Sequence, residues 1–135
     1  MALEDQLGKA IAGCKEESEK EVVREVYAFF DEQRSDIARS RHTDEIYGKV
    51  MVVGYDRHED LGVLFAGSMH EAENALREGI YHPESPVILY EFKSEHRDGK
   101  QRITGSGKIL LPQEAALRYV DTQARTRILP RPSVV

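Results

Sequence analysis

The sequence predicts an α+β fold, a four-stranded and mainly antiparallel sheet built from two hairpins at about 49–66 and 87–111. Three observations predict it. Apolar residues recur at helical spacing through the first 40 residues, strand-like runs follow in two later regions, and a capped helical segment separates those regions. We expect a single domain over residues 1–129, with 1–40 as its helical N-terminal segment and 130–135 as an extended or disordered tail.

The N-terminal segment has one apolar face, interrupted once. The face is formed by residues at helical spacing: Leu3, Leu7, Ala10, Ile11, Cys14, Val22, Val26, Phe29, Phe30 and Ile37. The interruption is the stretch KEESEKE at 15–21, which has no apolar residue. Either one long helix crosses solvent there or two helices meet, and the sequence leaves both open.

The first predicted hairpin is apolar on both faces. It reads KVMVVGY, then the polar loop DRHED, then LGVLFAG. If Tyr55 opposes Leu61, one face includes Met51 and Phe65, and the other is formed by Val50, Val52, Leu64 and Ala66. A half-solvated hairpin would alternate, so the second face is covered either by helices of the same chain or by another subunit. Val50, Val52 and Leu64 are therefore candidate interaction residues.

Capping residues in the sequence predict both ends of the crossover helix at 69–78. Ser68 is a predicted N-cap, Glu71 completes a capping box, and Gly79 follows the last turn. A last helix is predicted at about 112–125, because Pro112 suits a first helical position and apolar residues continue at helical spacing.

The dipeptide Asp98-Gly99 predicts the register of the second hairpin. As a two-residue turn it places Phe92 opposite Gly105 and Tyr90 opposite Gly107, so that aromatic rings cover the glycines. The other face then carries a polar row that includes Arg102, opposite Glu95, and Lys108. Arg102 and Lys108 are further candidate interaction residues, placed to meet acids of a partner.

Two tempting motifs fail on inspection. In ITGSGKILL at 103–111, the sequence GSGK lacks the first glycine and the final Ser or Thr of a phosphate-binding loop, and it runs into a strand. His70-Glu71 lacks the second histidine of a zinc-protease helix, since the fifth position is Asn74. We assign no catalytic residue and no cofactor.

All five histidines have an acid within two positions downstream. The simplest interpretation is a set of solvated histidines, with a loop metal site or a pH response as alternatives. His58 and Asp60, in the first hairpin loop, are the candidate metal ligands.

Charge and composition limit the classes of partner and the cellular location that we expect. The net charge of −5 opposes loose binding to nucleic acid, although the C-terminal region offers candidate contacts in Arg118, Arg125, Arg127 and Arg131. The single cysteine and an acidic, rather than basic, N-terminus favour a cytoplasmic location. Since no apolar run approaches the roughly 20 residues that span a bilayer, we expect no membrane insertion.

These observations favour a small, soluble, non-enzymatic module for protein interaction, regulation or assembly, which associates with itself as a homodimer or with another protein. One alternative is a small-molecule enzyme with a histidine and carboxylate site or a loop metal. His58, His96, Glu91 and Glu95 would be the first residues to examine for it. A second alternative is weak nucleic-acid binding through the C-terminal arginines.

Overall fold

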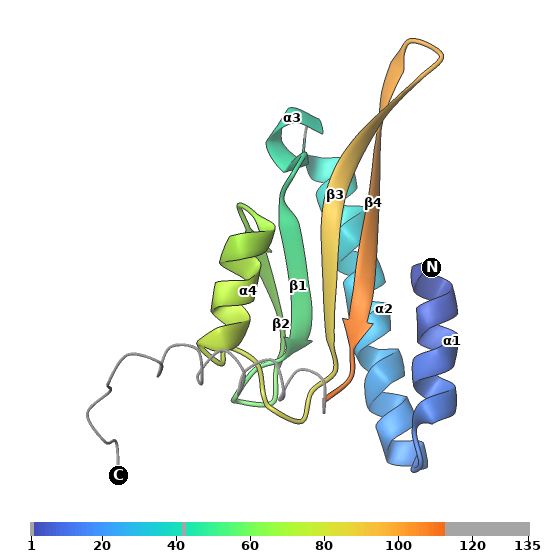
Figure 1. Cartoon of the computed structure of the whole chain (residues 1–135), viewed down its shortest axis with the longest axis vertical. Helices are drawn as coiled ribbons and strands as arrows, with labels where there is room; N and C mark the ends of the chain where they lie inside the picture. The colour runs from blue at the N-terminus through green and yellow to red at the C-terminus, as the bar shows by residue number, and fades with distance from the viewer. Residues whose placement is uncertain (1, 42, 113–135) are drawn as a thin grey trace, which may run out of the picture.

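The computed structural model describes residues 2–41 and 43–112 and confirms the predicted α+β class. The elements are α1 (Leu3–Gly13), α2 (Glu17–Ser40), α3 (Thr43–Ile46), β1 (Val50–Tyr55), β2 (Leu61–Ala66), α4 (Met69–Arg77), β3 (Val87–Arg97) and β4 (Lys100–Leu110). The strands form one antiparallel sheet in the order β2-β1-β3-β4, so β2 and β4 are its edges (Figure 1). Beyond Pro112, the predicted C-terminal helix and the tail at 130–135 lie outside the described residues.

The N-terminal segment forms two helices. Gly13 ends α1, and the backbone is extended at Cys14 and Glu16 before α2 begins. The break falls at residues 14–16, where the polar run begins, and residues 17–21 of that run form the first turns of α2. Both helices lie on one side of the sheet, with α1 beside β4 (Figure 1). Their apolar face packs on a core that includes Phe30, Met51 and Tyr90.

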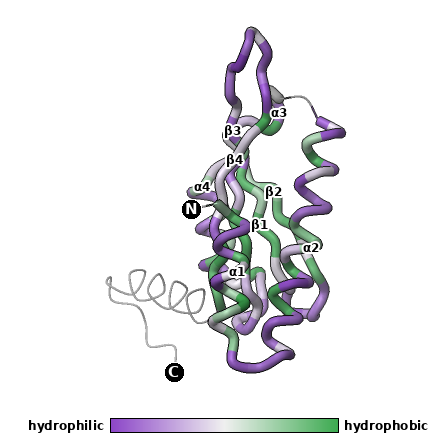
Figure 2. Tube along the Cα trace, turned by 90° about the vertical axis from the view of Figure 1, so that its right-hand side faces the viewer, coloured by the Kyte–Doolittle hydropathy of each residue, from purple (hydrophilic) through white to green (hydrophobic). Residues whose placement is uncertain are grey.

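The opposite side of the sheet is covered by α4 (Figure 2). The register of β1 and β2 is the predicted one, with Tyr55 opposite Leu61. Val50 and Val52 are 0% exposed beneath α4 and Tyr81, whose hydroxyl donates to the carbonyl of Val52 at 2.6 Å. The second apolar face of this hairpin is therefore covered by a helix of the same chain, and not by another subunit. Val50 and Val52 are core residues in this fold, not contacts for a partner.

The predicted start of α4 is also present. The Ser68 hydroxyl accepts from the backbone N–H of Glu71 at 3.2 Å, and the Glu71 carboxylate accepts from the backbone N–H of Gly67 at 2.8 Å. In the standard capping box the glutamate would reach Ser68, one residue later. Gly79, at φ 74°, follows the last turn as predicted.

The second hairpin has the predicted register and is longer than the first. Asp98 and Gly99 have φ of 54° and 75°, as the two-residue turn requires. Gly105 lies opposite Phe92 and Gly107 opposite Tyr90. The ring that lies against both glycines, however, belongs to Tyr90. The tip of this hairpin extends beyond the helices and is hydrophilic (Figure 2).

Candidate functional site

The two edges of the sheet differ in how they are protected, and α1 blocks part of the β4 edge. The side-chain amide of Gln6 donates to the carbonyl oxygen of Gly107 at 2.9 Å and accepts from the backbone N–H of Ile109 at 3.0 Å. In an antiparallel ladder these are the groups that point away from β3. Gln6 thus pairs with β4 as a neighbouring strand would, and blocks the end of that edge nearest the core.

The β2 edge has no such cover among the described residues. The hairpin closes with the N–H of Asp56 donating to the carbonyl of Asp60 at 2.8 Å, which fixes the alternation of the ladder. By this alternation the backbone groups of Leu61, Val63 and Phe65 point away from β1. Within residues 2–41 and 43–112 these outward groups have no hydrogen-bond partner.

The side chains of β2 do nothing to discourage pairing. The strand LGVLFA has no charge and no proline, and its register with β1 runs without a bulge. Natural sheets protect open edges with those devices. Val63, in the middle of the strand, is 41% exposed, and Figure 2 shows β2 as predominantly hydrophobic. We call the outward groups and side chains of Leu61, Val63 and Phe65 the β2 edge.

Charged residues lie at the two ends of the β2 edge. The guanidinium of Arg41 lies over the ring of Phe65, 5.1 Å from its centroid. At the other end, Glu59 and Asp60 belong to the hairpin loop. None of these three side chains makes an ion pair within the described part of the chain.

The hairpin loop is organised by Asp56, and this bears on the predicted metal site. One carboxylate oxygen of Asp56 accepts from the backbone N–H of His58 at 2.8 Å and from that of Asp60 at 3.0 Å. These bonds, led by the one from Asp60, lower the pKa of Asp56. Through residues 2–41 and 43–112 no group of three or more potential ligands could hold a metal ion. His58 and Asp60 therefore contribute their backbone to a turn and do not assemble a metal centre with described neighbours.

The other candidate contacts are spread over the sheet. Leu64 is half-buried on β2, facing α4. Arg102 is exposed and Lys108 half-buried, both on the polar face of β4. Arg102 lies opposite Glu95 as predicted, but no ion pair joins the two side chains. The four candidate arginines at 118, 125, 127 and 131 lie outside the described residues.

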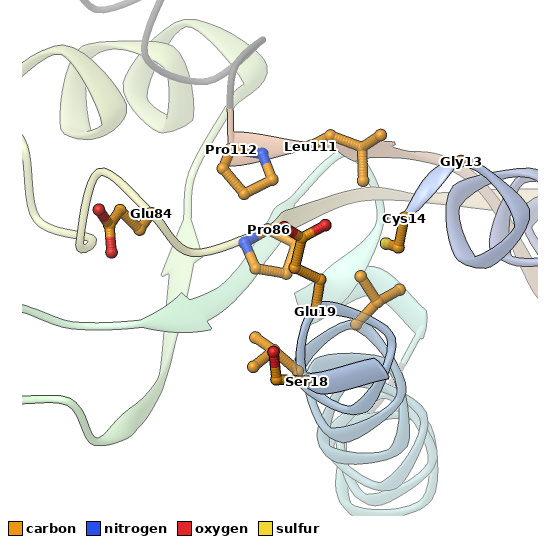
Figure 3. Close-up of a pocket in the computed structure, with 10 residues that line it drawn as sticks. Gly13, Cys14, Ser18, Glu19, Glu84, Pro86, Leu111 and Pro112 are labelled. Carbon is orange, nitrogen blue, oxygen red and sulfur yellow. The ribbon is translucent and has the colours of Figure 1, made fainter. Parts of the chain in front are cut away.

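A trough lies where the α1–α2 turn, the start of α2, the 82–86 loop and the end of β4 meet (Figure 3). Its volume is about 580 Å³. Its lining combines apolar and polar residues: Gly13, Cys14, Ser18, Glu19, Val22, Val23, Glu84, Pro86, Leu111 and Pro112. Two polar groups have structural partners already. The Glu19 carboxylate accepts from the backbone N–H of Lys15 at 3.3 Å, and the Cys14 thiol donates to the carbonyl of Ala10 at 3.2 Å.

A smaller hollow of about 330 Å³ adjoins this trough and shares Val22 and Glu84 with it. It brings His82 together with Glu59 and Glu84. The Nδ1 atom of His82 accepts from the backbone N–H of Glu84 at 3.1 Å, which leaves Nε2 as the nitrogen that carries the proton when the ring is neutral. Tyr55 also lines the hollow, and its hydrogen bond to Glu25 raises its pKa to about 12.

The enzyme candidates of the sequence analysis do not converge. His58 lies in the first hairpin loop and His96 near the tip of the second, while Glu91 and Glu95 lie along β3. The hollow selects a different histidine, His82. Its local signal in the sequence was the same downstream acid that every histidine shares, so nothing singled it out.

No family model matches the chain, and comparisons with curated proteins and with solved structures found no match. None of the helices in the described part is long and apolar enough to cross a membrane. Sequence reasoning also missed the β2 edge and the role of Gln6. The sequence does contain one sign of the edge, because LGVLFAG has no charged residue. It does not reveal the strand order that places this strand at an edge of the sheet.

Proposed function

We propose that the protein is a non-enzymatic interaction and assembly module that binds a protein partner by adding a strand at the β2 edge. The observation that carries the proposal is the contrast between the two edges. Gln6 blocks part of the β4 edge, while β2 presents backbone groups that have no partner among residues 2–41 and 43–112, on an uncharged strand. Strand addition takes its affinity from main-chain hydrogen bonds, which β2 offers at three positions, and its specificity from side-chain pockets.

The polar surfaces of the second hairpin are consistent with this role. Arg102 and Lys108 lie on the same side of the sheet as α4, but on β4, away from the strands β1 and β2 that α4 covers, so we expect them to be available to acids of a partner already held at the sheet. Charged contacts of this kind mainly set association rate and specificity, and the backbone ladder supplies the affinity.

A blocked, lysine-flanked peptide of alternating threonine and valine tests strand addition directly. We expect it to shift the backbone amide resonances of Leu61, Val63 and Phe65 in a nitrogen–proton correlation spectrum, with weak affinity in about the millimolar range. Val63→Pro should abolish the shifts, because proline removes the outward N–H of the central position.

Gln101→Pro is the matched control, since residue 101 is an outward position on the other edge strand. It should leave the shifts at β2 unchanged. Shifts confined to other parts of the chain, or equal loss in both proline variants, would contradict the proposal.

The second candidate function is that of a small-molecule enzyme acting in the hollow, carried by the meeting of His82 with Glu59 and Glu84. A fragment screen by the same spectra tests it. Hits should shift the amides of Tyr55 and Ser85, and His82→Gln should weaken them about tenfold through loss of one polar contact. His96→Gln, at the distant hairpin tip, is the control. Hits that are insensitive to His82→Gln would count against this site.

A further inference from the structure

We infer that the strand added to β2 is β2 of a second copy of this chain, antiparallel, with a two-fold axis at Val63. The inference rests on the proposed function and names its partner. The result would be a continuous sheet of eight strands, four from each copy, with helices on both faces.

The positions of the outward backbone groups select this register. In an antiparallel pair, residues with outward groups must face one another to exchange hydrogen bonds. An axis at Val63 places Val63 opposite Val63 of the second copy and Leu61 opposite Phe65 of the second copy, so all three outward residues are paired. An axis at Leu64 would instead place Leu61 opposite Gly67, whose N–H is already bonded to Glu71. The Val63 register is therefore the one that satisfies the whole edge.

The side chains are self-complementary in the same register. Leu61, Val63 and Phe65 lie on one face of β2, so the pairing sets a branched aliphatic residue against an aromatic ring at each side of a central valine pair. Cross-strand pairs of this type stabilise a sheet, and no charge of the strand loses water when it forms.

The charges at the ends of the edge favour a second copy in the antiparallel direction. Antiparallel pairing brings Arg41, over Phe65, to the end where the acidic loop of the second copy lies, with Glu59 and Asp60. Parallel pairing would place the two acidic loops side by side. Since these side chains have no ion pair within the described residues, the new ion pair would form without breaking an existing ion pair.

Disulfide trapping tests the register. In a Cys14→Ser background, which leaves no other cysteine, Val63→Cys should form a covalent dimer in oxidised buffer. The Cα atoms of a hydrogen-bonded antiparallel pair lie about 5.5 Å apart, within the range that a disulfide bridges. Leu61→Cys should not form this dimer, because its equivalent in the second copy lies four residues along the strand. Gln101→Cys, on the β4 edge, is the surface control. Equal trapping of all three variants, or none at position 63, would overturn the register.

Exchanging the two charges tests the proposed ion pair between Arg41 and the acidic loop of the second copy. Sedimentation equilibrium measures the dissociation constant of the dimer. We expect dimerisation in about the micromolar range, weakened about fivefold by Arg41→Asp or by Glu59→Arg alone, since Glu59 and Arg41 lie on the same side of the sheet. The double variant should return to within about twofold of the native value, since the pair is restored with its signs exchanged. Additive weakening in the double variant would overturn the contact.

The experiments separate this inference from the proposed function. A chain that stays monomeric at high concentration, while the threonine and valine peptide still shifts the β2 amides, would overturn the second copy and leave strand addition standing. A monomer whose β2 amides ignore the peptide would overturn both. A dimer that Val63→Pro leaves intact would overturn the inference, because it must use another surface.

Discussion

At the scale of single residues, the sequence GSGK is explained by packing. A Cβ atom on Gly105 would lie 2.5 Å from the hydroxyl oxygen of Tyr90 and 2.6 Å from the carbonyl oxygen of Glu91. Because Gly105 and Gly107 have no side chains, the ring of Tyr90 can lie against β4 and reach α2. There its ring meets Phe30 at 5.3 Å between centroids, and Arg34 lies 5.8 Å from its centroid. The two glycines therefore allow the second hairpin to pack against α2 through Tyr90.

Gly105→Ala should destabilise the fold by about 1 to 3 kcal/mol, the usual cost of overpacking a filled site. The added methyl group would displace the Tyr90 ring or the backbone of β3. Urea denaturation followed by circular dichroism measures the change in the free energy of unfolding. Gly8→Ala is the control, because a Cβ atom at Gly8 would have nothing within 4 Å and alanine favours a helix by about 0.5 to 1 kcal/mol. Equal effects of the two substitutions would refute this account.

At the scale of elements, α2 and α4 begin with a shared device. In each, a glutamate at the third helical position accepts from the backbone N–H just before the N-cap: Glu19 from Lys15, and Glu71 from Gly67. The bond pairs the backbone N–H of the residue that precedes the N-cap, and so fixes the chain where it enters the helix. Only α4 adds a side-chain N-cap, in Ser68, whereas Glu16 makes none at α2. The start of α4 is correspondingly the one that the sequence alone predicts.

Elements defined by neighbouring residues were predictable, and those that depend on distant contacts were not. The register of the second hairpin follows from Asp98-Gly99, because both turn residues adopt positive φ. The burial of Val50 and Val52 was left open, since it depends on where α4 packs. The bond from Gln6 to Gly107 joins residues 101 positions apart, and no local pattern marks it. The candidate site was missed for the same reason, because an edge is a property of strand order.

At the scale of the whole molecule, the described residues leave the sheet with one partly blocked edge and one uncovered edge, and we expect this difference to limit how the sheet grows. If a second copy adds at β2, both β2 strands become internal and the remaining edges are the two β4 strands. Each of these has Gln6 of α1 bonded to it. A two-fold contact uses the same surface on both copies and closes, whereas a contact between unlike edges would continue into a filament. The position of α1 should therefore hold the assembly at two chains.

Gln6→Leu tests this limit. Loss of the amide leaves the carbonyl of Gly107 and the N–H of Ile109 without this partner, which should cost about 1 to 3 kcal/mol and loosen α1. In light scattering the native chain should level off at twice its 15.3 kDa mass, while Gln6→Leu should form larger species as concentration rises.

Lys9→Leu, an exposed change on the same helix, controls for added apolar surface. Combining Gln6→Leu with Val63→Pro should suppress growth, because each chain then has only one edge free to pair. Growth that appears equally in Lys9→Leu, or that survives Val63→Pro, would show that the sheet edges do not govern assembly.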